Sequence, residues 1–123
     1  MAFNKDIVAL AQKNESFRQE VVTGTHCQVV LMSIPAGGEI GEEVHHDVDQ
    51  VLVFVGGKGK AIINGEQSPV AANSLCFVPA GATHNFINTG TGDLKLYTVY
   101  APPEHAPGTV HHTKAEADAA EHA

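Results

Sequence analysis

The sequence has little positive charge and no long apolar run. Seven Lys and Arg residues stand against fourteen Asp and Glu residues, which gives a formal net charge of −7. This charge would repel a polyanion such as nucleic acid, so we exclude nucleic-acid binding. No stretch approaches the roughly 20 apolar residues that cross a bilayer, and residues 1–6 lack the basic start of a secretory signal. We therefore expect a cytoplasmic protein that does not bind a membrane.

Cysteine is also scarce, with only Cys27 and Cys76 in the chain. The two residues lie far apart, so the close C-x-x-C spacing of a zinc knuckle is absent. Both lie in apolar, strand-like runs. We expect them to be reduced thiols packed in the core.

The remaining pattern is typical of a small all-β domain. A chain of 123 residues fits one domain, which buries roughly two thirds of its unfolded surface. Residues 5–14 have apolar side chains at helical spacing, which predicts a short N-terminal helix. Short apolar runs separated by turn residues then recur at residues 29–32, 51–55, 61–63, 75–78 and 94–100. Such regular spacing favours a β-sandwich or β-barrel.

Turn and cap residues divide the chain further. Asn64-Gly65 predicts a two-residue hairpin turn, because both residues tolerate positive φ. Pro102-Pro103 ends the last strand, and residues 113–116 (TKAE) predict the start of a short C-terminal helix. We assign an N-terminal helix and first strand to residues 1–24, the β-barrel to 25–101, and a tail with a short helix to 102–123. We expect the tail histidines to be solvated: His105, His111, His112 and His122.

Two polar segments lie within the barrel region. The second, residues 79–88, reads P-x-G-x2-H-x3-N through Pro79, Gly81, His84 and Asn88. This segment resembles the second motif of the cupin superfamily. Asn73 stands where that motif opens with glycine. Asparagine is the next best residue for a turn that needs positive φ, so this departure is mild.

The first segment, residues 41–50, resembles the other cupin motif. Counting back from Gly57 places Gln50 at the motif's glutamate position, His45 at its second histidine position and Glu43 at its first. Where the commoner pattern supplies three histidines and a glutamate, this chain has two histidines, a glutamate and a glutamine.

The resemblance covers about residues 25–101. The sequence is similar to those of small bacterial cupins of the mannose-6-phosphate isomerase-like group. Residues 94–105 and 113–115 resemble the closing segment of that group. The resemblance implies an all-β, single-domain cupin: a double-stranded β-helix, or jelly-roll barrel, with a short N-terminal helix and a short C-terminal helix. Compared with the larger zinc phosphomannose isomerases, the chain lacks an extra helical domain and an evident basic phosphate clamp.

The resemblance also implies one divalent metal ion, held by Glu43, His45, Gln50 and His84. Residues two apart on a strand point the same way, so Glu43 and His45 would both face the interior. Nitrogen and oxygen donors suit zinc, manganese, iron(II), nickel or cobalt, and exclude a thiolate-type site. We favour zinc slightly. The alternative is that the two histidines are ordinary buried residues.

Three functions remain open at this point. The first is an isomerase-like enzyme that uses the metal to act on a sugar or carbonyl compound, with its catalytic residues unassigned. The second is a metal-dependent dioxygenase. The third is a non-catalytic cupin that binds a small ligand, because a fold alone does not specify a function.

The strand over residues 50–55 suggests a partner. Alternation turns Gln50, Leu52 and Phe54 inward, yet the outward face is apolar too, with Val51, Val53 and Val55. A strand that is apolar on both faces needs a second layer. We therefore predict a homodimer, unless the N-terminal helix covers this face.

Overall fold

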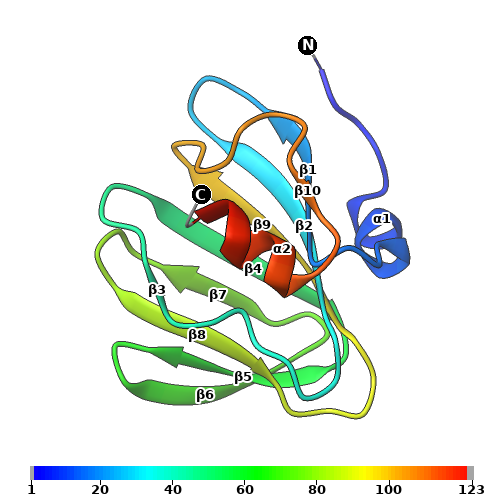
Figure 1. The fold of residues 1–123 in the computed structure, drawn as a ribbon, viewed down its shortest axis with the longest axis vertical. Coiled ribbons are helices and arrows are strands. Elements are labelled where there is room, and N and C mark those ends of the chain that lie inside the picture. Colours follow the sequence, from blue (N-terminus) through cyan, green and yellow to red (C-terminus); the bar gives the residue numbers. More distant parts are fainter. Residues whose placement is uncertain (1, 122–123) are drawn as a thin grey trace.

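The computed structural model describes residues 2–121, and over them the chain forms two helices and ten strands (Figure 1). The helices are α1 (Ile7–Lys13) and α2 (Lys114–Glu121). The strands are β1 (Arg18–Thr23), β2 (Gln28–Ile34), β3 (Glu43–Val44), β4 (Asp49–Gly56), β5 (Lys58–Ile63), β6 (Glu66–Ala71), β7 (Leu75–Val78), β8 (Thr83–Asn88), β9 (Leu94–Ala101) and β10 (Val110–His111). The all-β prediction with one short helix near each end is confirmed. Neither helix is long and apolar enough to cross a membrane.

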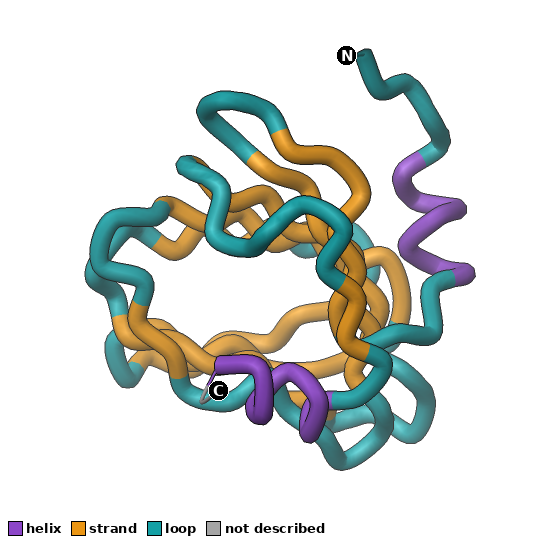
Figure 2. The backbone as a smooth tube through the Cα atoms, turned by 45° about the horizontal axis from the view of Figure 1, so that its top comes forward, coloured by secondary structure: helices purple, strands orange, loops and turns teal. Residues whose placement is uncertain are grey.

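The strands form two antiparallel sheets that enclose the core. One sheet has six strands in the order β10-β1-β2-β9-β4-β7, and the other has four in the order β3-β8-β5-β6. Figure 2 shows the two sheets closing around a common interior, with α1 outside the ring of strands. Strands that are adjacent in each sheet are mostly distant in sequence, so the arrangement depends on long-range pairing.

Alternation along β4 sets the inner face of the larger sheet. Gln50, Leu52 and Phe54 are buried, whereas the residues between them are half-buried on the outer face. Phe54 reaches across to Phe86 of the smaller sheet, with ring centroids 5.7 Å apart. Tyr100 pairs in register with Gln50 on one side and with Gln28 on the other. One end of the inner face is therefore polar, although it is buried.

Turn chemistry agrees with the sequence. Asn64 and Gly65 join β5 to β6 with φ values of 49° and 83°, so the predicted hairpin is confirmed. Asn73 has a φ of 77°, which is why asparagine serves where the motif has glycine.

The tail folds back over the barrel instead of leaving it. β10 pairs with β1, and α2 begins with a capping interaction in which the amide of Glu116 donates to the Thr113 hydroxyl at 3.1 Å. Buried Gln28 holds the tail through two hydrogen bonds to the backbone of His105: it donates to the carbonyl oxygen at 2.6 Å and accepts from the amide at 3.0 Å.

The structure of the tail and of the turn between β1 and β2 corrects three expectations from the sequence. His105 and His111 are half-buried against the barrel and not solvated, whereas His112 is exposed as predicted; His122 lies outside the described residues. Cys27 is exposed because it lies in the turn between β1 and β2, where the Gly24 amide donates to its carbonyl oxygen at 2.8 Å. Only Cys76 packs against the core as expected.

Candidate metal centre

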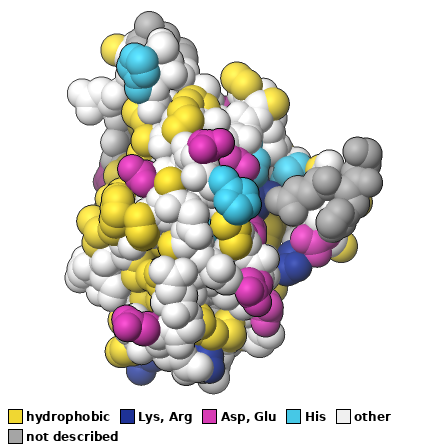
Figure 3. All heavy atoms as spheres, turned by 90° about the vertical axis from the view of Figure 1, so that its left-hand side faces the viewer, with side chains coloured by type: hydrophobic (Ala, Val, Ile, Leu, Met, Phe, Trp, Pro, Cys, Tyr) yellow, Lys and Arg dark blue, Asp and Glu magenta, His cyan; other side chains and the backbone are white. Residues whose placement is uncertain are grey.

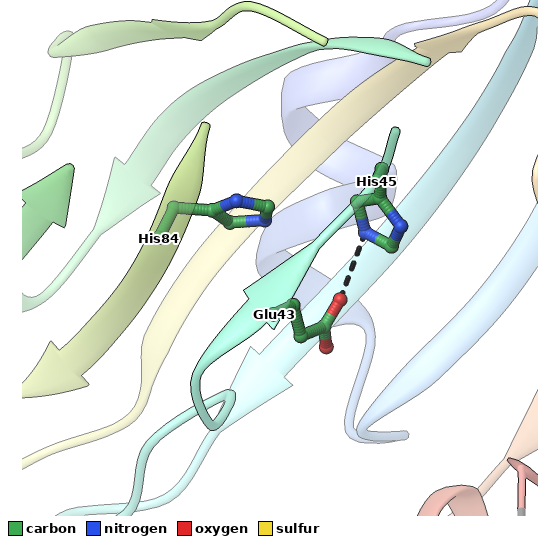
Figure 4. Close-up of side chains that lie close together, drawn as sticks. All are labelled: Glu43, His45 and His84. Atoms are coloured by element: carbon green, nitrogen blue, oxygen red, sulfur yellow. Dashed lines mark ion pairs between the residues drawn. The ribbon is translucent and has the colours of Figure 1, made fainter. Parts of the chain in front are cut away.

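Three of the four predicted ligands meet inside the barrel. Glu43 lies on β3, His45 follows that strand directly, and His84 lies on β8, opposite Glu43 in register. Figure 4 shows the two imidazoles and the carboxylate turned toward a common space. One ligand atom from each residue lies within 4.8 Å of the others. Val44 and His46 are exposed, so the predicted alternation along this segment is confirmed.

Both imidazoles are oriented by acceptors on their far side. Nδ1 of His84 lies 3.0 Å from the carbonyl oxygen of Ala82, and since a carbonyl only accepts, Nδ1 carries the proton. Nδ1 of His45 lies 3.4 Å from Oε1 of Glu104. Such contacts commonly orient metal-binding histidines and leave Nε2 for the ion. The two rings lie 5.3 Å apart, centroid to centroid.

The carboxylate of Glu43 is held in its charged form. Burial alone would raise the pKa of Glu43, but the hydrogen bond with His45 and the nearby His45, Arg18 and His84 lower it overall. Oε2 of Glu43 lies 2.8 Å from Nε2 of His45. A negatively charged carboxylate oxygen of Glu43 therefore lies beside the imidazoles of His45 and His84. This set of donor atoms fits a divalent ion such as zinc or manganese.

Gln50 has the features expected of a further oxygen donor. Its side chain is 3% exposed, and its Nε2 donates to the Thr98 hydroxyl at 3.0 Å. That hydroxyl donates onward to the carbonyl oxygen of Val51 at 2.9 Å, so it accepts from Gln50 and fixes which way the amide is turned. Oε1 of Gln50 is buried and has no hydrogen-bond partner among residues 2–121. A buried acceptor of this kind calls for an explanation, and a bound ion supplies one.

The motifs did not reveal the residues that surround this centre. Arg18 of β1 is 2% exposed, and its Nη2 lies 4.0 Å from Oε1 of Glu43. Its Nη1 lies 3.3 Å from Nδ1 of His111. One feature of the sequence could have pointed to Arg18. It is the only arginine in the sequence, and it lies at the start of a strand, next to the apolar residue Phe17. No motif marks it, because β1 reaches the site only through tertiary packing.

Tyr100 and His105 complete the wall beside Arg18. Their rings are 5.1 Å apart and nearly perpendicular, and Tyr100 also packs against His45 at 5.9 Å. Burial raises the pKa of Tyr100, so its hydroxyl stays protonated. Burial, followed by the charge of Arg18, lowers the pKa of His105 to about 4, so this imidazole is neutral at pH 7.

The site opens to solvent through a polar mouth. A cavity of about 320 Å3 is lined by Glu42, Glu43, Val44, His45 and Glu104. In Figure 3, acidic and histidine side chains lie close together on the face toward the viewer, with hydrophobic side chains beside them. A small molecule entering here would come into contact with Glu43 and His45.

The fold and these residues together define a small β-barrel protein with a candidate metal centre in its interior. The family model described as a cupin domain matches residues 30–100, and the chain belongs to this family. Thus the predicted membership of the cupin superfamily is confirmed.

Known relatives agree with this assignment. Uncharacterized protein YrkC of Bacillus subtilis is 46% identical over 126 residues, which cover 97% of this chain and 67% of that protein. An oxalate-binding protein of Thermotoga maritima is 31% identical over 68 residues, covering 55% of this chain and 56% of that one. The chain spans about two thirds of the length of the curated relatives that it matches over most of its own length.

Solved structures have the same architecture. The Bacillus halodurans protein BH2720 superimposes with a TM-score of 0.96 at 42% identity, covering 97% of this chain and 95% of that one. A predicted oxalate decarboxylase of Thermotoga maritima gives a TM-score of 0.61 at 26% identity, covering 64% and 69%.

Proposed function

We propose that the chain is a metal-dependent enzyme that acts on a small sugar or carbonyl compound, in the manner of an isomerase. One divalent ion would be held by Glu43, His45, His84 and Gln50, with zinc favoured over manganese, iron, nickel and cobalt. The observation that carries the proposal is the meeting of three ligand atoms within 4.8 Å. A divalent ion at such a place polarises a carbonyl or hydroxyl oxygen as a Lewis acid.

The surrounding residues are suited to that chemistry. Oε1 of Glu104 lies 3.4 Å from Nδ1 of His45, close enough to influence how the imidazole is oriented. His105 packs against Tyr100 as a half-buried neutral imidazole, and its lowered pKa of about 4 makes it a weak base near neutral pH. Tyr100 offers a neutral hydroxyl as a donor. We leave the proton-transferring residue unassigned between them.

Two other functions are compatible with the same centre. A metal-dependent dioxygenase would use the same ligands with a redox-active ion such as iron. A non-catalytic cupin that binds a small ligand is favoured by one relative, the oxalate-binding protein of Thermotoga maritima. Its similarity covers 55% of this chain, which is why we place this function second.

Elemental analysis and turnover together test the proposal. We expect about one divalent ion per purified chain, and solvent-deuterium exchange beside the carbonyl of a small hydroxycarbonyl substrate, followed by NMR. His84→Ala should lose both. Oxygen consumption with the same compounds would favour the dioxygenase, and tight binding without exchange or oxygen consumption would favour the binding protein. A chain that takes up no divalent metal contradicts the proposal.

We also propose that two copies associate through the outer face of β4 and β7. Leu75 and Phe77 of the edge strand β7 are 62% and 54% exposed, and they pair in register with Val53 and Val51. α1 packs on β2, β9 and β4 and covers only part of this face. A second copy of the chain would bury the remaining apolar stripe.

The acidic net charge supports a small-molecule partner rather than nucleic acid. We place the activity in the cytoplasm, as the sequence predicts, and within the mannose-6-phosphate isomerase-like group of cupins.

A further inference from the structure

The C-terminal tail contributes a residue to the cavity at the candidate metal centre. Glu104 lies in the loop between β9 and β10, and it lines the cavity of about 320 Å3 together with Glu43 and His45. Oε1 of Glu104 lies 3.4 Å from Nδ1 of His45. A carboxylate of the tail therefore faces a proposed metal ligand of the barrel.

Hydrogen bonds hold this part of the tail, residues 102–111, to the barrel. Oε1 of Gln28 accepts from the backbone amides of Glu104 at 3.3 Å and His105 at 3.0 Å. Further along, Oε1 of Glu20 accepts from the amide of Gly108 at 3.1 Å, and β10 pairs with β1 beside it (Figure 1). All the residues of this segment are exposed or half-buried. A segment that buries so little apolar surface opens locally at a small cost in free energy.

His45 lies between a carboxylate of the barrel and a carboxylate of the tail. Its Nε2 is 2.8 Å from Oε2 of Glu43, a normal hydrogen-bond distance. The 3.4 Å between Nδ1 and Glu104 is longer than the roughly 2.7–3.2 Å of an N–H···O hydrogen bond. The contact with the tail is therefore the looser of the two, and it has room to tighten.

Metal binding by His45 would change what this histidine requires of its neighbours. An imidazole that binds an ion through Nε2 carries its hydrogen on Nδ1, and a carboxylate commonly accepts that hydrogen. Glu104 is already beside Nδ1. A hydrogen bond to a charged acceptor is stronger than one between neutral groups, so the Glu104 contact should tighten when His45 holds an ion.

We propose that Glu104 is a positioning residue for His45 that couples metal binding to the docking of residues 102–111. Glu104 orients His45 when the segment is docked. In turn, the segment docks more firmly when His45 holds an ion, because a coupling between two equilibria is reciprocal. This inference rests on the proposed metal centre, and it means that one wall of the cavity is fixed in place only in the metal-loaded protein.

The size of the coupling follows from the exposure of Glu104. Residues that hydrogen-bond to a metal ligand raise the affinity for the metal by about 10- to 100-fold. The side chain of Glu104 is 32% exposed, so water screens part of its charge. We therefore expect a factor near the lower end of the range, about 10-fold.

Glu42 provides a matched comparison. It lines the same cavity and is exposed, but it belongs to the barrel and not to the tail. Its charge attracts a cation through space, as that of Glu104 does. A difference between variants of the two residues therefore separates the contact with His45 from a general effect of negative charge at the mouth of the cavity.

The first measurement is the affinity for zinc, by competition with a chelator. Glu104→Ala should bind zinc about 10-fold more weakly than the wild type. Glu42→Ala should bind it less than about 3-fold more weakly, as for a screened surface charge. Glu104→Gln keeps a side-chain oxygen that can accept from Nδ1 of His45 but loses the charge, so its affinity should lie between those of Glu104→Ala and the wild type.

The second measurement is amide hydrogen exchange by NMR, with and without zinc. In the wild type, saturating zinc should slow exchange at the amides of His105 and Gly108 about 10-fold, because it lowers the undocked population by the coupling factor. The amide of Ser74, in the turn between β6 and β7, should exchange at the same rate in both conditions. In Glu104→Ala the effect of zinc on the tail amides should disappear. A residue that only stabilised the fold would alter these amides equally with and without zinc.

The outcomes separate this inference from the proposed function. Wild-type tail amides that exchange equally with and without zinc overturn the inference and leave the metal centre standing. So does a zinc affinity of Glu104→Ala equal to that of the wild type or of Glu42→Ala. If Glu104→Ala does not fold, Glu104→Gln and the wild-type exchange rates decide the question. A wild type that takes up no divalent ion overturns the proposed function and this inference with it.

Discussion

The side-chain amide of Gln50 donates to the hydroxyl of Thr98 at 3.0 Å, across the paired strands β4 and β9. Thr98 in turn donates to the carbonyl oxygen of Val51. This chain of bonds leaves the oxygen of Gln50 as a buried acceptor with no partner among residues 2–121. A buried oxygen without a hydrogen-bond partner is available as a neutral ligand, and a nearly isosteric change tests whether Gln50 has this role.

Gln50→Glu should keep or tighten metal binding and should destabilise the protein once metal is removed. With an ion bound, the added carboxylate has a positive partner. Without one, it is a buried charge that has lost the donor contact to Thr98, at a cost of several kcal/mol. Melting temperature with and without a chelator, together with metal affinity, measures both effects. Equal destabilisation in the two conditions, with unaltered affinity, would remove Gln50 from the ligand set.

His84→Ala should abolish stoichiometric metal binding. Losing a residue that only hydrogen-bonds to a metal ligand lowers the affinity for the metal by about 10- to 100-fold. Losing an imidazole that binds the metal directly should therefore lower this affinity by more than about 100-fold. The matched control is His46→Ala, since His46 is exposed on the outer side of the same segment as His45. Elemental analysis after dialysis gives the result. Equal metal content in the two variants would show that the ion, if any, binds elsewhere.

Local rules account for much of what the sequence predicted correctly. The two-residue period places Gln50 and Leu52 on the inner face, and the turn residues Asn64-Gly65 mark a hairpin, because both depend on near neighbours in the chain. The two motifs identified Glu43, His45 and His84 because their spacing encodes strand register. The structure brings these three residues together, and their role as metal ligands stays a prediction.

Long-range packing accounts for what was missed. Arg18 reaches the site from β1, and His105 reaches it from a tail that Gln28 holds against the barrel. Neither contact follows from periodicity or from a motif, since each joins residues more than 20 positions apart. Cys27 differs for a local reason: the apolar run at residues 29–32 suggests a core strand that includes Cys27, yet this residue lies in the turn before β2 and is exposed.

Phe77→Asp should convert a dimer to a monomer. A charge at this exposed position would lie in the centre of the proposed interface, where desolvating it is unfavourable. The matched control is Val110→Asp, which changes a valine that is 44% exposed on β10, at the other edge of the same sheet. Light scattering coupled to size exclusion measures the mass of each variant. A wild type that is monomeric at tens of micromolar, or a Phe77→Asp variant that stays dimeric, would count against the interface.

His105 should make the metal-free protein less stable as the pH falls from 6.5. The pKa of His105 is lowered to about 4 by burial and by Arg18, whereas the ordinary value is 6.5. Between these values the unfolded chain binds more protons than the folded one, so stability rises with pH from about 4 to 6.5 and levels off above it. Glu43 acts in a different window. Because its folded pKa is lowered from 4.5, it contributes stability above about pH 4.5 that is lost below it.

The free energy of unfolding, measured with urea at pH 6.5 and at pH 5, therefore reports the contribution of His105 separately from that of Glu43. A fully buried group with this shift would lose about 1.6 kcal/mol over that interval, and since His105 is partly exposed we expect about 1 kcal/mol. His105→Gln removes the group that takes up the proton, so the variant should show a smaller loss of stability across the interval by about that amount. His26→Gln, an exposed histidine in the turn between β1 and β2, should leave the loss unchanged. If His105→Gln retains the full wild-type dependence, the imidazole is not held neutral by the barrel, and its place beside Arg18 would have to be revised.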